Sequence, residues 1–174
     1  MADALLIIDM LNDFVQPGAP LEVPEARKII KPIQDRIARA RSENRPVIYI
    51  CDAHTPDAPE FSRMNWPPHA VRGTTGAQII SELAPGEMDS VIEKNIYSGF
   101  HHTGLEGLLQ SRKIDHLILT GCVTNICILY TAYDAVTRGF TVTVPSDCVA
   151  SLDPADGTFA LKQMSTVLGV QVEA

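Results

Sequence analysis

Three residues that could take part in acid–base or nucleophilic chemistry stand just past short apolar runs of this sequence. They are Asp9, Lys94 and Cys127. Each has an ordinary explanation when taken alone. An Asp after a strand usually caps a helix or binds a loop, a lone Lys is usually a solvated charge, and a lone Cys is usually a small core residue. Together they offer a carboxylate, an ammonium group and a thiol, which can act as base, cation and nucleophile.

Cys127 has the most informative surroundings of the three. It ends the segment GCVTNIC at residues 121–127, a glycine-bearing turn that leads into a predicted helix. In the first turn of a helix the dipole favours the thiolate, and a neighbouring lysine would act in the same direction. Backbone N–H groups of the turn could also hold the oxyanion of a tetrahedral intermediate. Cys122 is the second choice of nucleophile, because it lies at the strand end rather than in the helix.

Residues with metal-binding side chains lie in the long stretch between positions 52 and 75. Asp52 and His54 are two positions apart, so in an extended segment their side chains point to the same side. His69 follows two prolines, which stiffen the backbone that presents it. Two histidines and one carboxylate form a common open metal site. An Asp–x–His pair alone is more often a loop hydrogen bond, so spacing alone leaves both interpretations open.

Other aromatic and histidine side chains are less specific. Phe14, Trp66 and Tyr97 could form the walls of a pocket for a flat aromatic ring, although ordinary core packing explains each of them equally well. His101 and His102 are adjacent, and we expect neighbours on a chain to point apart and therefore not to share one ion. We interpret these two histidines as surface or oligomer-contact residues.

Short apolar runs must supply the strands that position these residues. The runs predict strands at residues 4–8, 47–51, 90–92, 116–120 and 140–144, with a short sixth at 170–172. Because the runs are continuously apolar rather than alternating, they indicate a parallel sheet covered on both faces. In such folds the active site lies beyond the carboxyl ends of the strands, where Asp9, Lys94 and Cys127 fall.

Helical patterns fill the intervals between the runs, at about residues 31–42, 104–112, 125–138 and 154–168. The last of these helices has Asp153 as its N-cap, ends at Gly169 and is expected to turn Ala160, Met164 and Val167 inward. The alternation predicts one doubly wound α/β domain over residues 1–174, with a mostly parallel six-stranded sheet and helices on both faces. Residues 52–75 show no clear periodicity, and loops of that length are usually functional or disordered.

Composition excludes several classes of function. The chain has 174 residues, of which 45% are hydrophobic, so it can bury a real core. Its formal net charge of -7 argues against a nucleic-acid partner. No apolar run approaches the roughly 20 residues that span a bilayer, and the N-terminus lacks the basic region of a signal peptide. We therefore expect a cytoplasmic protein without a membrane partner, whose four cysteines are too few for a disulfide scaffold.

Three stretches in combination resemble the isochorismatase-like family of cysteine hydrolases. They are IIDMLNDF at residues 7–14, EKNIYSGF at residues 93–100 and the turn at residues 121–127. The resemblance runs nearly end to end, and its motifs are specific in combination though weak singly. It implies a six-stranded parallel sheet and an Asp-Lys-Cys triad at Asp9, Lys94 and Cys127. It also implies a cis peptide between Cys122 and Val123, with the amides of Val123 and Cys127 forming the oxyanion hole.

The same resemblance extends to the metal site. WPPH at residues 66–69, followed by GTTGA at residues 73–77, looks like the stretch that carries a metal-ligating histidine in nicotinamidases. The resemblance therefore assigns ligand roles to Asp52, His54 and His69. We expect a divalent metal, Zn²⁺ first, with iron or manganese as alternatives that suit the same donors. Nicotinamidases often add a fourth ligand, for which Glu60 is the obvious candidate here, and that role stays open.

The reaction implied by the resemblance is hydrolysis of a small carboxamide, with nicotinamide giving nicotinate and ammonia through a thioester. Asp9 would take the proton of Cys127, Lys94 would hold the Asp9 carboxylate, and the metal would orient the ring through its nitrogen. Relatives are commonly dimers or tetramers, so a homo-oligomer is expected. One alternative is hydrolysis of a carbamoyl or ureido compound, or of a vinyl ether. Another is a non-catalytic binding protein on the same fold.

Overall fold

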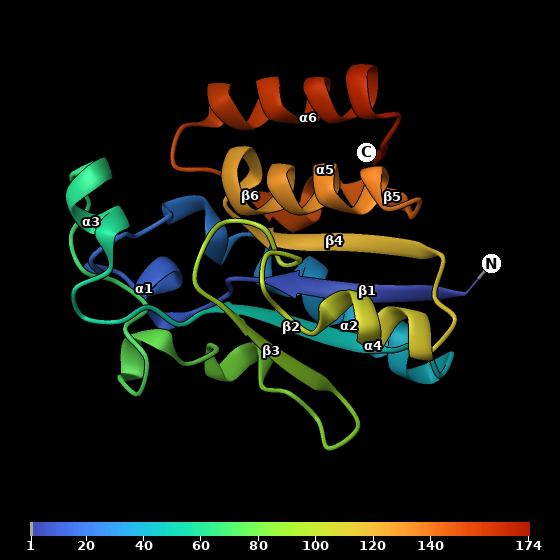
Figure 1. Cartoon of the computed structure of the whole chain (residues 1–174), viewed down its shortest axis with the longest axis horizontal. Coiled ribbons are helices and arrows are strands. Elements are labelled where there is room, and N and C mark those ends of the chain that lie inside the picture. Colours follow the sequence, from blue (N-terminus) through green and yellow to red (C-terminus); the bar gives the residue numbers. More distant parts are fainter. Residues whose placement is uncertain (1) are drawn as a thin grey trace.

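A parallel sheet forms the centre of the molecule, and the computed structural model describes the chain over residues 2–174 (Figure 1). Within that range the sheet has seven strands: β1 Asp3–Ile8, β2 Val47–Asp52, β3 Ser90–Lys94, β4 His116–Cys122, β5 Thr141–Pro145, β6 Val149–Ala150 and β7 Gln171–Glu173. Their order is β3-β2-β1-β4-β5-β7, β6 pairs with β4, and all these pairs are parallel. The predicted parallel sheet is confirmed. The extra strand is β6, whose two residues are too few to give a periodic signal.

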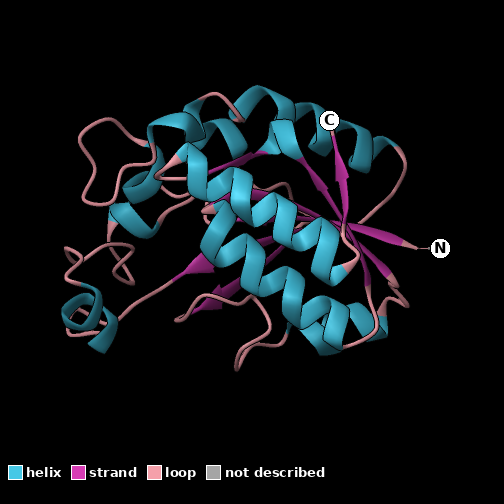
Figure 2. Cartoon of the chain, turned by 90° about the horizontal axis from the view of Figure 1, so that it is seen from above, coloured by secondary structure: helices cyan, strands magenta, loops and turns pink. Residues whose placement is uncertain are grey.

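Helices cover both faces of the sheet (Figure 2). The α-helices are α1 Asn12–Val15, α2 Ile30–Ser42, α3 Pro59–Met64, α4 Leu105–Ser111, α5 Leu129–Thr137 and α6 Pro154–Leu168. Shorter 3-10 helices span Pro24–Arg27, Thr75–Ala77, Ser81–Leu83 and Ser146–Cys148, and a π-helical turn spans Thr124–Ile128. Among the described residues, none of the helices has both the length and the apolar character needed to cross a membrane.

Strand β1 shows why the apolar runs are continuous. Leu5 and Ile7 pack into a core beneath α2, whereas Leu6 and Ile8 pack into a second core beneath α4, α5 and α6. Since successive side chains of a strand point to opposite faces, a strand between two helical layers needs apolar residues at every position. Each fully buried aliphatic side chain contributes about 1.5–3 kcal/mol. These two cores fix the sheet from both sides and so fix the strand ends.

Helix α6 begins and ends where the sequence predicts. The Asp153 side chain accepts a hydrogen bond from a backbone amide of the first turn, and Gly169 ends the helix at φ +70°. Met164 is buried as expected, but the prediction that Val167 points inward is wrong, since its side chain is 68% exposed. Leu168, four residues after Met164, packs against the core instead. The buried stripe therefore follows i, i+4 spacing at the end of the helix.

The stretch between β2 and β3 has more structure than its sequence predicted. It contains α3, the 3-10 helices Thr75–Ala77 and Ser81–Leu83, and a bridge between His54 and Val71. Helix α3 has six residues, of which Glu60 and Phe61 are buried. Because six residues make fewer than two turns, the apolar pattern of α3 is too short to be recognised as helical.

Candidate functional site

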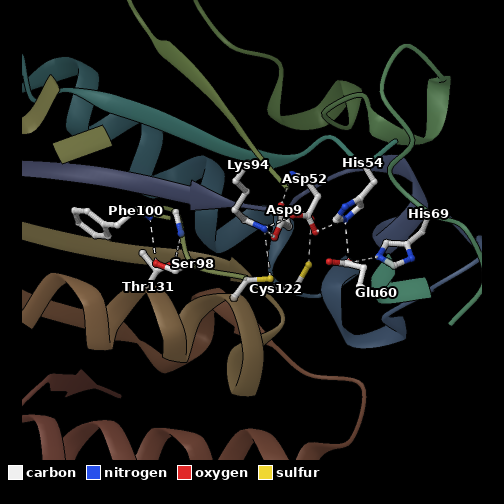
Figure 3. A network of polar contacts seen from close by, with 12 residues as sticks. Asp9, Asp52, His54, Glu60, His69, Lys94, Ser98, Phe100, Cys122 and Thr131 are labelled. Atoms are coloured by element: carbon white, nitrogen blue, oxygen red, sulfur yellow. Dashed lines mark hydrogen bonds and ion pairs between the residues drawn. The ribbon is translucent and has the colours of Figure 1, made fainter. Parts of the chain in front are cut away.

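Four chemically capable side chains meet at the carboxyl edge of the sheet, and Figure 3 shows three of them, Asp9, Asp52 and Lys94. Asp9 follows β1, Asp52 ends β2, Lys94 ends β3, and Cys127 follows β4. These strands are neighbours, and the register places Asp52 beside Lys94. The parallel sheet thus gathers residues from positions 9 to 127 of the sequence at one edge.

The backbone between β1 and β4 is unusually close at this edge. Gly121 has φ +111°, and a Cβ there would lie 2.0 Å from the carbonyl oxygen of Ile8. Only glycine therefore fits at position 121 without moving a strand. Asp9 itself adopts φ +53°, a conformation that is uncommon for residues other than glycine and is found often at functional positions. The expected cis peptide between Cys122 and Val123 is present.

Lys94 is the centre of the catalytic candidates. Its side chain is buried, and Nζ lies 2.8 Å from Oδ2 of Asp9 and 3.6 Å from Sγ of Cys127. Nζ also donates a short hydrogen bond to Asp52. The other carboxylate oxygen of Asp9 accepts a hydrogen bond of 2.8 Å from the amide of Asp52. The three residues predicted as a triad are thus brought into one buried cluster.

Charge and burial set the protonation of this cluster. Burial, together with the negative charge of Asp52, raises the pKa of Asp9 to about 6. Burial also acts to raise the pKa of Asp52, but Lys94 and His54 outweigh it and lower that pKa to about 2. The pKa of Lys94 is well above its usual value, because the attraction of the carboxylates exceeds the cost of burial. Asp9 is therefore the carboxylate able to exchange a proton near neutral pH.

Cys127 lies in the π-helical turn Thr124–Ile128, within the first turn as predicted. The sequence predicts that the helix dipole and Lys94 favour the thiolate, and Lys94 does act in that direction. Burial raises the pKa of the Cys127 thiol well above 9.0, with Lys94 opposing this rise only in part. Cys122 is also buried, and its thiol donates to the backbone oxygen of Asp9 at 3.2 Å. Of the two, Cys127 is the cysteine in contact with Lys94.

A second cluster of donors lies beside the first. Donor atoms of Asp52, His54 and His69 lie within 4.8 Å of one another. Oε1 of Glu60 is 3.2 Å from Nε2 of His54 and 3.9 Å from Nε2 of His69. Figure 3 shows these side chains turned toward one another. The structure therefore gathers the three predicted ligands and places Glu60, the candidate for a fourth ligand, beside both histidines.

The hydrogen bonding of the histidines fits a metal. Both ring nitrogens of His54 are buried, and within residues 2–174 neither makes a hydrogen bond of good geometry. Buried polar atoms are normally paired, so such atoms need a partner. Nδ1 of His69 lies 2.9 Å from the carbonyl oxygen of Pro67, a contact that fixes the ring and leaves Nε2 on the side of Glu60. Two imidazoles and two carboxylates suit zinc, iron or manganese.

Asp52 joins the two clusters. One of its oxygens contacts Lys94, and the other lies 3.4 Å from Nε2 of His54. From the sequence, Asp52 was assigned to the metal site alone. Its contact with Lys94 arises because both residues end adjacent parallel strands at paired positions. A change in the charge of either cluster therefore alters the electrostatic surroundings of the other, because both contact the Asp52 carboxylate.

A pocket opens over both clusters and has aromatic walls. All three predicted wall residues, Phe14, Trp66 and Tyr97, line it. The pocket is also lined by Leu21, Ile126 and Leu152, apolar side chains that were not predicted to lie there. Aliphatic residues of this kind carry no signal that distinguishes a pocket wall from a core position.

His101 and His102 do not line this pocket, and both are exposed as predicted. Their ring centroids are 4.2 Å apart, so the expectation that the two rings point apart is wrong. His102 has φ +51°, a backbone conformation that extended neighbours do not share. Their role as oligomer contacts stays a prediction.

Comparison with known proteins agrees with the fold. A family model described as the Isochorismatase domain matches residues 3–174. Three solved structures with similar folds illustrate the range of relatives. An N-carbamoylsarcosine amidase from Thermoplasma acidophilum is 35% identical, with a TM-score of 0.90 over 99% of this chain and 96% of that chain.

The other two structures are amidases of nitrogen heterocycles by name. A nicotinamidase from Bacillus subtilis is 32% identical, with a TM-score of 0.93 over 100% of each chain. A pyrazinamidase from Pyrococcus horikoshii, in complex with zinc, is 30% identical, with a TM-score of 0.92 over 99% of this chain and 98% of that chain. The three structures match nearly the whole chain at 30–35% identity, and their names give different substrates.

Proposed function

The chain belongs to the isochorismatase family, and on that premise we propose that it is a metal-assisted cysteine amidohydrolase that converts nicotinamide to nicotinate and ammonia. The observation that carries the proposal is the buried contact of Lys94 with both Asp9 and Cys127, beside a histidine–carboxylate cluster. A thiol, a base and a cation in one buried cluster are the groups that amide cleavage through a thioester requires.

In the proposed first step, Cys127 attacks the amide carbon of the substrate. Because burial keeps this thiol protonated at rest, its proton moves to Asp9 as the S–C bond forms. A pKa of about 6 makes Asp9 a base that is ionised at neutral pH and can still hold a proton. The oxyanion would be held by the backbone amides of Val123 and Cys127.

The tetrahedral intermediate then collapses to a thioester. The C–N bond breaks, and Asp9 returns the proton to the leaving nitrogen, which departs as ammonia. Water, activated by the free Asp9 carboxylate, attacks the thioester and releases nicotinate while the thiol regains its proton. Throughout, Lys94 keeps its charge and stabilises the ionised form of Asp9, which it contacts at 2.8 Å.

Asp52, His54, His69 and Glu60 are the proposed ligands of a divalent metal, with Zn²⁺ the first choice. A metal held there would supply a Lewis acid that binds the ring nitrogen of the substrate and so fixes its orientation. The ring centroids of His54 and His69 are 5.2 Å apart, and His69 lines the pocket. The aromatic rings of Phe14 and Trp66 pack against His69 and would flank a flat ligand.

Charge favours a neutral substrate over an anionic one. The two clusters contain the carboxylates of Asp9, Asp52 and Glu60, and their one lysine, Lys94, is already paired with two of them. A divalent metal would bring the clusters close to electroneutrality, which leaves no excess positive charge for a substrate carboxylate. N-carbamoylsarcosine carries such a carboxylate, whereas nicotinamide is neutral. This supports nicotinamide over an anionic ureido acid.

A comparison of the two substrates tests this choice. Zinc-loaded protein is expected to hydrolyse nicotinamide with a kcat/KM at least about a hundredfold above that for N-carbamoylsarcosine, a ratio that corresponds to roughly 2.7 kcal/mol. Ammonia release by a coupled assay gives both values. Faster release from the carbamoyl compound would reverse the assignment of substrate within the family. Tight binding without turnover of any small amide would favour the non-catalytic alternative.

A further inference from the structure

The carboxylate of Asp13 holds the backbone beside His69. Asp13 lies in α1, and its Oδ2 accepts a hydrogen bond of 2.8 Å from the amide of Ala70. Ala70 is fully buried and has φ +45°, a conformation that residues with a side chain rarely adopt. A conformation of this kind persists only where its surroundings impose it. The hydrogen bond that Ala70 donates to Asp13 is one of the contacts that do so.

Ala70 links the two histidines of the metal cluster. Its carbonyl oxygen accepts a hydrogen bond of 2.9 Å from the amide of His54. The carbonyl oxygen of His54 in turn accepts one of 2.9 Å from Arg72, which completes a small parallel bridge. His69 directly precedes Ala70 in the chain. A shift of Ala70 would therefore displace both histidines relative to each other.

The Asp13 carboxylate is confined from its other side by Gly76. A Cβ at position 76 would lie 2.1 Å from Oδ2 and 2.3 Å from Cγ of Asp13. Helix α1 is also tied to this segment, because the side-chain amide of Asn12 donates to Thr75 at 2.8 Å and the backbone amide of Asn12 donates to Gln78 at 2.9 Å. The absence of a side chain at Gly76 is therefore what lets the carboxylate reach Ala70.

We propose that Asp13 is a positioning residue that sets the spacing of His54 and His69 through Ala70 and thereby sets the affinity of the cluster for a divalent metal. It acts through the backbone, not as a ligand. This inference rests on the metal site of the proposed function. It adds a residue from α1 to a site whose ligands come from β2 and from the stretch after it.

Two substitutions disturb this contact from opposite sides. Asp13→Ala removes the acceptor for Ala70, and Gly76→Ala pushes the carboxylate away while leaving Asp13 in the chain. Each is expected to weaken zinc binding about tenfold to a hundredfold, the usual effect of losing a group that orients a metal ligand. Asp13→Asn keeps an acceptor oxygen and is expected to stay within a few-fold of wild type. Gly107→Ala in α4, where a Cβ meets open space, is the matched control.

The readouts are independent of turnover. Zinc affinity is measured by competition with a coloured chelator, and the visible spectrum of the Co²⁺-loaded protein reports the ligand geometry. Hydrogen exchange of the Ala70 amide in metal-free protein reports the contact itself. Asp13→Ala and Gly76→Ala should both change the Co²⁺ spectrum, and Asp13→Ala should speed exchange at Ala70. A general loss of structure would not be rescued selectively by Asp13→Asn.

The possible failures are distinguishable. If wild type and Asp13→Ala bind zinc equally and give the same Co²⁺ spectrum, the positioning role is wrong and the proposed amidase stands. If wild type binds no zinc, the metal site and this inference fall together. Should Asp13→Ala not fold, Gly76→Ala still decides, because wild-type affinity in that variant would overturn the inference.

Discussion

At the scale of single residues, Lys94 is the side chain on which the charge balance of the site depends. It is a buried ammonium in contact with Asp9 and Asp52. Buried ion pairs cost desolvation free energy, and they are stable only when each charge keeps its partner. The geometry around Lys94 therefore serves function more than stability. It holds Asp52, with a pKa of about 2, and Asp9, with a pKa of about 6, close to the thiol of Cys127.

Replacement of Lys94 should be costly for stability as well as for turnover. In Lys94→Met two buried carboxylates lose their cation, so the free energy of unfolding should fall by about 3–5 kcal/mol. Urea unfolding at neutral pH measures this change. Lys162→Met, at an exposed position of α6, is the control and should change stability little. A loss below about 1 kcal/mol for Lys94→Met would mean that the carboxylates are not charged at rest.

The protonation of Cys127 has its own test. Because burial raises the pKa of this thiol above its ordinary value, the thiolate fraction is small at neutral pH and grows as pH rises. The rate of alkylation by iodoacetamide at Cys127, located by mass spectrometry, should therefore climb from pH 6 to pH 9 without a plateau. Cys127→Ala identifies background labelling of the other cysteines. A rate independent of pH between 6 and 8 would instead indicate a thiolate at rest.

At the scale of elements, the junction of β1 and β4 positions the catalytic residues. Asp9 and Gly121 both have positive φ there, and the two strands approach too closely for any side chain at position 121. The turn that carries Cys127 begins directly after this point. The placement of the nucleophile relative to the base is therefore a property of the strand ends.

Gly121→Ala tests the importance of that junction. A Cβ 2.0 Å from the carbonyl oxygen of Ile8 must push β4 from β1, and φ +111° adds backbone strain. The free energy of unfolding should fall by more than about 3 kcal/mol, with turnover lost in the folded fraction. Thermal unfolding provides the measurement, and Gly107→Ala in α4 is the control for a glycine with space around it. Wild-type stability in Gly121→Ala would contradict the close approach.

Elements with strong local signals were predictable, and those defined by tertiary contacts were not. Buried strands such as β1 appear as continuous apolar runs because both faces are covered, and α6 has an Asp N-cap and a glycine stop. By contrast, α3 and β6 are too short for periodicity to show. The contact of Asp52 with Lys94 depends on strand register, which a single sequence does not specify.

At the scale of the whole molecule, the strand order explains why distant residues meet. The order β3-β2-β1-β4 places the ends of four strands side by side, so each contributes one chemical group to the site. The triad positions could be predicted because each follows an apolar run. The pocket walls could not be assigned with equal certainty, because an aromatic residue packs in cores and pockets alike. A homo-oligomer stays a prediction.

The most direct measurement is ammonia release from nicotinamide by the purified protein, with and without prior chelation. Wild-type protein should release ammonia, lose most of that activity on chelation and regain it when Zn²⁺ is restored. Cys127→Ala should lower the rate at least about a thousandfold while its thermal unfolding stays close to that of wild type. Full turnover by Cys127→Ala would contradict the assignment of Cys127 as the nucleophile. Turnover indifferent to chelation would contradict the part assigned to His54, His69 and their carboxylate partners.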